Sequence, residues 1–243
     1  MLKRVKDNKC RLIEKHAVGF YVPLKDQLTA LLALPEFQTG FDNGMSSDLC
    51  YDFADAAYVR QHEIGVTSTT LLLRLYTDDF EVVNPIGAHR KKHKITAFYW
   101  TLLNIPPEHR SKLSTIQLLA MAKSQHIRKF GVQKLLQDFN NTLNKLWSGV
   151  NFCFDDGQVH LYNGFLVCAL ADTPAAQLLG GFKEGVGSAI SPCRSCDVKQ
   201  SDMARLFTSA ECSMRNRDEH CNRLTHLSQQ NKRGFEYWSK HWV

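Results

Sequence analysis

One stretch of the chain, residues 71–104, joins two apolar runs through a polar and basic connection. The first run, LLLRLYT at residues 71–77, is directly followed by Asp78 and Asp79, and the second run spans residues 95–103. A short apolar run that ends in carboxylates is typical of a buried central strand whose end delivers charge to a site. Carboxylates at such a strand end suit a hard cation. The same pattern also fits a strand followed by an ordinary acidic turn.

Size and composition restrict the class of protein. The 243 residues allow one large domain, or one domain with an appendage. No stretch reaches about 18 uninterrupted apolar residues, and the basic start MLKRVKDNKC lacks the apolar centre of a signal peptide. We therefore expect an intracellular chain without a membrane span. Eight cysteines in such a chain favour reduced thiols and metal ligands over disulfides, and the formal charge of +6 permits nucleic acid as a partner.

The remaining apolar patterns predict an α/β fold. In chain order we expect a strand at 18–22, a helix at 24–34, loops with one or two short helices over 37–63, a strand or helix at 116–122, an amphipathic helix over 132–147, and a hairpin from 150 that turns at 155–157. A further apolar run, residues 165–171, ends on Asp172, and Pro174 is placed for the first turn of a helix.

Two apolar strands therefore each end on an acid, Asp78 in one and Asp172 in the other. If the two strands are adjacent, their carboxylates can hold a pair of divalent ions about 3.5–4 Å apart. Such a pair activates water or a hydroxyl against a phosphodiester and stabilises the leaving oxygen. This is the chemistry of ribonuclease-H-like nucleases and transposases.

Three short motifs follow one another along a stretch that spans about half of the chain. They are YTDDFE with NPIG at residues 76–87, LNIPPE at 103–108 after an aromatic strand, and ADTPA at 171–175 with CRSC at 193–196 after a Gly-containing stretch. Together they resemble the catalytic region of CACTA-type (En/Spm-like) DNA transposases and of the transposon-derived animal proteins related to them.

The resemblance implies an RNase H-like mixed sheet with flanking helices, and a DDE-type core that uses Mg²⁺ or Mn²⁺ on DNA in the nucleus. Asp78 matches the first catalytic acid and Asp172 the second, with Asp79 as the alternative to Asp78, because strand register decides which side chain faces the metal. A homo-oligomer is compatible with this family. The implied organisation is an N-terminal accessory segment at 1–65, the core at 66–180 and a zinc-type insertion at 181–243.

The chain departs from the family pattern after the insertion. The family's third carboxylate lies on a later helix, whereas Glu211, Glu219 and Glu236 match no motif here. We therefore expect an incomplete catalytic core, in which weakened metal binding disfavours strand transfer.

Cysteine spacing near the end predicts half of a zinc site. Cys193 and Cys196 form a CxxC pair, and the related transposases carry CxxC with histidines at this position. The expected partners are His220, with His226 or Cys221 as the fourth ligand, and Cys212 is a further candidate. The alternative is a buried pair of small, reduced side chains.

A basic segment follows the first acids, and it includes Arg90, Lys91, Lys92 and Lys94. These cations could contact phosphates close to Asp78, or form a solvated turn.

Two functions follow from the sequence: a metal-dependent polynucleotidyl transferase core, or a non-catalytic module that binds nucleic acid or protein and contains structural zinc. A third carboxylate beside Asp78 and Asp172 would favour the first.

Overall fold

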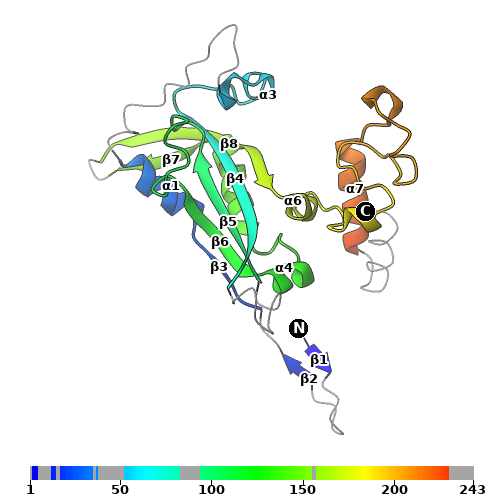
Figure 1. Ribbon diagram of the computed structural model, residues 1–243. Helices are drawn as coiled ribbons and strands as arrows, with labels where there is room; N and C mark the ends of the chain where they lie inside the picture. Colours follow the sequence, from blue (N-terminus) through cyan, green and yellow to red (C-terminus); the bar gives the residue numbers. More distant parts are fainter. Residues whose placement is uncertain are drawn as a thin grey trace. The chain divides into compact units, whose positions relative to one another are not determined.

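The structure is a computed structural model, and it describes residues 2–4, 12–14, 17–34, 37, 52–82, 94–154 and 157–229. The chain divides into two compact units, residues 1–170 and 171–243, which are described separately. The first unit contains a six-stranded, mixed and curled sheet with flanking helices (Figure 1). No helix in these described ranges has the length and apolar character needed to cross a bilayer.

The sheet has the strand order β3-β6-β5-β4-β8-β7. In that order the strands span Gly19–Tyr21, Gln117–Lys123, Lys94–Leu102, Thr70–Glu81, Val159–Ala171 and Val150–Cys153. The pairs β3–β6, β6–β5, β5–β4 and β8–β7 are antiparallel. The pair β4–β8 runs in the same direction and makes the sheet mixed (Figure 1). Two short strands, β1 (Leu2–Arg4) and β2 (Leu12–Glu14), pair with each other in a separate ribbon.

Helices cover one face of the sheet because their apolar stripes match it. Helix α1 (Leu24–Leu32) buries its four leucines, and α5 (Gln137–Ser148) buries Phe139 and Leu146. The indole of Trp100 on β5 donates to Gln27 of α1 at 2.7 Å, which fixes α1 on this face. The short helix α4 (Ser124–Phe130) follows β6 directly.

On the opposite face, the described residues form a buried cluster where β4 begins. It consists of Val59, Leu72, Leu103 and Phe165, and Phe53 packs against it. Phe53 and Val59 come from η1 (Phe53–Asp55) and α3 (Ala57–Arg60), short helices in the region where the sequence predicts them. The side chain of Asn104 extends the ladder past the end of β5, because it accepts from Leu72 N–H at 2.8 Å and donates to the Thr70 carbonyl at 2.9 Å.

Buried Arg110 ties this cluster to the loop after β5. Its guanidinium pairs with the Asp52 carboxylate and donates to the carbonyls of Leu103 and Ile105. Burial would raise the pKa of Asp52, but hydrogen bonds from Arg110 and from the Phe53 N–H outweigh it and lower that pKa.

The second unit has little regular structure. Its helices are α6 (Thr173–Leu179), η2 (Val186–Ser188), η3 (Ser209–Glu211) and α7 (Arg217–Gln229). In its described part, the buried apolar side chains are those of Ala189, Pro192 and Cys196. Such a small apolar core contributes little hydrophobic stabilisation, so other contacts must hold this unit together.

Most of the predicted elements are present, with two differences at their ends. The ambiguous run at 116–122 is strand β6, and the predicted hairpin is β7–β8, with Gly157 at a φ of 78° in its turn. Strand β4 does not end before Asp78 but continues to Glu81, because β5 pairs with it along this whole length. Helix α5 begins at Gln137, five residues later than expected.

Strands β4 and β8 approach each other very closely at Gly164. A Cβ atom at this position would lie 2.6 Å from the Leu71 carbonyl oxygen and 2.8 Å from the Leu71 Cβ. These atoms belong to the rigid centre of the sheet, so they cannot move aside at low cost. Glycine is therefore required where the two strands meet.

We expect Gly164→Ala to lower the free energy of unfolding by about 1–3 kcal/mol, the usual cost of overpacking a core, as measured by urea unfolding. Gly187→Ala is the control, because a Cβ added there meets no atom within 4 Å. A Gly164→Ala protein as stable as the parent would show that the two strands are not this close.

Candidate functional site

The paired acids of the first unit lie within β4 and point to opposite faces of the sheet. Asp78 is opposite Ala97 of β5, and Asp79 is opposite Thr96. Because successive side chains of a strand alternate between faces, only one of these two acids can serve a given site. The surroundings of each carboxylate indicate which one is available.

Asp79 is held in a hydrogen-bond network that joins β4, β5 and α4. Its Oδ1 accepts from the Thr96 hydroxyl at 2.5 Å and from the Ser124 hydroxyl at 3.2 Å. Its Oδ2 lies 3.6 Å from the Arg128 guanidinium. Both hydroxyl residues are buried, and the Thr96 hydroxyl also lies 2.9 Å from that of Ser124, so Asp79 completes a buried network of three side chains.

Asp78 is exposed and has only local partners. Its Oδ2 accepts from the Tyr76 hydroxyl at 3.2 Å, and its Oδ1 accepts from the N–H of Asp79 at 2.8 Å. Each carboxylate oxygen keeps a lone pair directed away from these donors. Asp78 is therefore better placed than Asp79 to bind a hard cation from solution.

Asp172 directly follows β8 and belongs to the second unit. It caps helix α6, because its Oδ1 accepts from the N–H of Ala175 at 2.9 Å, and Pro174 lies in the first turn as expected. An N-cap aspartate is a common structural feature of a helix. It is also exposed, and whether its carboxylate meets that of Asp78 stays a prediction.

Two of the acids considered as a third carboxylate, Glu211 and Glu219, are used locally. Oε2 of Glu211 accepts from the N–H groups of Phe207 and Thr208, and these donors lower the pKa of Glu211. Glu219 pairs with Arg223 on α7, and Glu236 lies outside the described residues.

The predicted CxxC pair belongs to a cluster of three thiols in the second unit. The side chains of Cys193 and Cys212 lie near Cys196, and both raise the pKa of its thiol. Burial would raise the pKa of Cys193, but the N–H groups of Ser195 and Cys196 outweigh it and lower that pKa. The Ser195 N–H lies 3.4 Å from the Cys193 sulfur. The N–H of Val198 lowers the pKa of Cys196, but burial and the Cys193 thiol outweigh it and raise that pKa.

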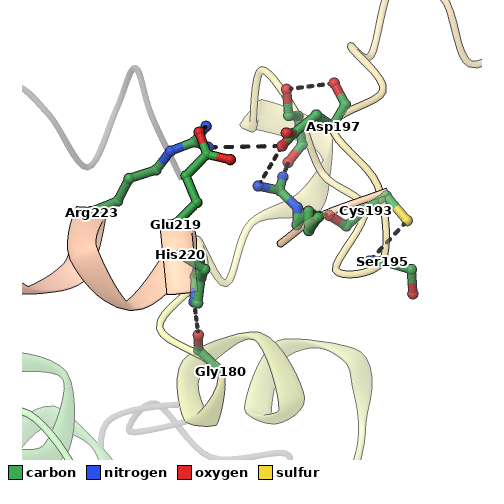
Figure 2. A network of polar contacts seen from close by, with 9 residues as sticks. Gly180, Cys193, Ser195, Asp197, Glu219, His220 and Arg223 are labelled. Carbon is green, nitrogen blue, oxygen red and sulfur yellow. Dashed lines mark hydrogen bonds and ion pairs between the residues drawn. The ribbon is translucent and has the colours of Figure 1, made fainter. Parts of the chain in front are cut away.

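Arg215 organises the loop that carries these thiols. It donates to the carbonyls of Cys193 and Ser191 at 2.9 and 3.0 Å, and its guanidinium lies 2.7 Å from the Asp197 carboxylate. Figure 2 shows Asp197 at the centre of this network, with Arg223 of α7 reaching it at 3.8 Å. Main-chain pairing of Cys196 with Met214 holds the two loop segments together.

His220 is engaged away from the thiols. Its Nε2 lies 2.8 Å from the Gly180 carbonyl oxygen (Figure 2), and its ring stacks on Phe182 at 4.4 Å between centroids. Cys221 and His226 are exposed on α7. In the described part of the chain, no group of three or more His, Cys, Asp or Glu side chains is arranged to hold a metal ion. The thiol donors suit zinc, but the structure does not assemble His220, His226 and Cys221 around them.

The structure describes only the last residue of the basic segment, Lys94. Arg90, Lys91 and Lys92 lie outside the described residues, as do Cys10 and Cys50. Lys94 is the first residue of β5 and is partly buried. Its register partner is Glu81, at the end of the β4–β5 ladder.

Comparison with protein-family models finds no matching family, and comparison with curated proteins finds no relative. Functional inference for this chain therefore rests on the geometry described above.

Sequence reasoning did not identify the residues that organise the two candidate sites. Thr96 and Ser124 hold Asp79, and Arg215 holds the CxxC loop. Thr96 could have been found from register, because an antiparallel partner strand places a hydroxyl beside the acid. The partner of a buried arginine carries no comparable signal in one sequence.

We expect Asp79→Ala to lower the free energy of unfolding by about 1–3 kcal/mol, because Thr96 and Ser124 then keep only their bond to each other and one buried hydroxyl loses its acceptor. Asp78→Ala is the matched control, since Asp78 is exposed, and should change stability by less than about 0.5 kcal/mol. Urea unfolding of both variants measures the difference. A larger effect at Asp78 would reverse the assignment of the two acids.

Proposed function

We propose that this chain is an RNase H-like, DDE-transposase-type core that acts on DNA, with Asp78 and Asp172 as metal-binding carboxylates for Mg²⁺ or Mn²⁺. The observation that carries the proposal is the strand order. Strands β4 and β8 are neighbours and run in the same direction. Asp78 lies near the C-terminal end of β4, and Asp172 follows the last residue of β8.

The carboxyl ends of two parallel neighbours lie at the same edge of a sheet, which is where such sheets place their ligands. An exposed carboxylate at the end of each strand suits a divalent cation, and a metal pair would activate a water and stabilise the leaving oxygen of a phosphodiester. The antiparallel order β6-β5-β4 next to β8 also supports an RNase H-like core.

The core is proposed to be catalytically incomplete. Glu211 and Glu219 are engaged by their own segments, and no described acid joins Asp78 in a group of three. Two carboxylates hold a metal pair less firmly than three. We therefore expect weak nicking of DNA and no strand transfer.

Manganese binding and nicking of supercoiled DNA test this function. We expect Mn²⁺-dependent nicking to fall at least about 100-fold in Asp78→Asn and in Asp172→Asn, because each substitution removes a charged ligand. Asp26→Asn, an exposed acid of α1, is the control and should nick like the parent. Calorimetry of Mn²⁺ binding provides a readout independent of turnover.

Two results would contradict the proposal. Nicking that survives both substitutions would come from a contaminant or from another site. Loss of nicking in Asp79→Asn, with Asp78→Asn unaffected, would move the first ligand to the other face of the sheet.

A second candidate function is a non-catalytic binding module that contains structural zinc. The observation in its favour is that the second unit buries few apolar side chains but gathers three thiols around Cys196. Small units with poor cores commonly depend on a metal. The N–H groups directed at the Cys193 sulfur favour its thiolate, the form that binds zinc.

We expect purified protein to contain about one zinc per chain, and Cys193→Ser or Cys196→Ser to lose it. Cys221→Ser, which changes an exposed thiol on α7, is the matched control and should retain the metal. Metal analysis and limited proteolysis of the second unit measure both effects. Metal-free protein that resists proteolysis equally well would show that the thiols only fill space.

A further inference from the structure

The sheet of the first unit has an open area around Asp78, which we call the open face. Strand register defines it, because cross-strand partners share a face of a sheet. One row of partners is Phe20, Met121, Ala97 and Asp78, from β3, β6, β5 and β4. The two adjacent rows are Lys123, Ile95 and Phe80 on one side, and Leu118, Tyr99 and Tyr76 on the other.

Three aromatic side chains of the open face are exposed, whereas Ala97 at the centre of its middle row is 1% exposed. The exposed fraction is 66% for Phe20 and 42% for both Tyr76 and Phe80. On the opposite face of the same strands, Thr77 and Phe98 are each 1% exposed. The cover that η1 and α3 provide on the open side ends near Leu72, so the aromatic rings lie beyond it.

Packing within the sheet explains only part of this exposure. Tyr76 and Tyr99 form a cross-strand ring pair with centroids 6.3 Å apart. Phe20 and Phe80 have no ring partner among the described residues, although they lie on strands at opposite sides of the open face. Three strand spacings of about 4.8 Å separate those strands, so the aromatic surface is roughly 14 Å wide.

The charges on the open face restrict what can bind it. Asp78 is its single carboxylate in the described rows, and Arg74 and Lys123 lie on the same side without an ion-pair partner in the described part of the chain. An apolar protein surface docked here would remove three charged side chains from water, Asp78, Arg74 and Lys123, which is unfavourable. A ligand that stacks on rings, contacts cations and leaves Asp78 accessible to a metal avoids this cost.

Single-stranded nucleic acid meets all of these requirements. Unpaired bases stack on exposed aromatic side chains of a sheet, while their phosphates contact lysine and arginine. We propose that the open face binds unpaired nucleotides, with Phe20 and Phe80 as stacking platforms and Arg74 and Lys123 as phosphate contacts. This inference rests on the proposed function and deepens it, because it identifies the substrate as DNA with unpaired bases next to Asp78.

Fluorescence anisotropy with a labelled 15-nucleotide oligo-dT, in EDTA, tests the platform without any metal chemistry. We expect Phe20→Ala and Phe80→Ala each to weaken binding about 5- to 100-fold, the usual effect of removing one stacking ring. Phe20→Trp should retain binding. Phe207→Ala removes a ring that is 83% exposed in the second unit, and it should bind like the parent.

Several outcomes would overturn the proposal. These are no binding of oligo-dT, binding unchanged in both alanine variants, equal affinity for a duplex of the same length, or a dimer that Phe20→Ala dissociates without any effect on DNA. Circular dichroism of each variant separates lost binding from lost folding.

The same assay separates this inference from the proposed function. Asp78→Asn should bind oligo-dT in EDTA at least as well as the parent, because one negative charge is removed. Binding of oligo-dT without nicking would refute the transferase function and leave the nucleotide-binding surface intact. Nicking that does not depend on Phe20 and Phe80 would refute the nucleotide-binding surface and leave the transferase function intact.

Discussion

The close contact between β4 and β8 is the constraint on which the first unit depends. Both strands are central, and at Gly164 a single added carbon would collide with the main chain of Leu71. This contact brings together the strands that carry Asp78 and precede Asp172. It also lets the buried cluster around Leu72 and Phe165 form across the two strands. The packing of the two strands therefore depends on the absence of one side chain.

Adjacent positions in β4 have opposite physical roles. Asp79 faces buried hydroxyls and stabilises the junction of β4, β5 and α4, whereas Asp78 faces water beside Tyr76. Strand alternation alone produces this division, and a shift of register by one residue would exchange the two roles. The open face around Asp78 combines an exposed carboxylate with exposed rings, so the metal and base binding that we propose would not compete there.

Strong periodic signals in the sequence predicted the elements well, whereas signals that depend on partners did not. The apolar run at 71–77 identified β4. The strand continues through Asp78 to Glu81 because it pairs with β5, and the polar residues of this segment give no sign of that pairing. The CxxC spacing predicts half of a zinc site, and this stays a prediction, although the cysteines do lie near each other. The expected ligand His220 instead bonds to Gly180 and stacks on Phe182, contacts of tertiary origin that one sequence does not encode by spacing.

The contacts of Arg215 affect which amino-acid substitutions the second unit can tolerate. This guanidinium holds the CxxC loop through the main-chain carbonyls of Ser191 and Cys193, not through their side chains. Main-chain atoms are the same for every amino acid, so the loop keeps its shape when its side chains are replaced. The second unit can therefore accumulate substitutions in this loop and acquire new surface chemistry, as long as the arginine and Asp197 persist.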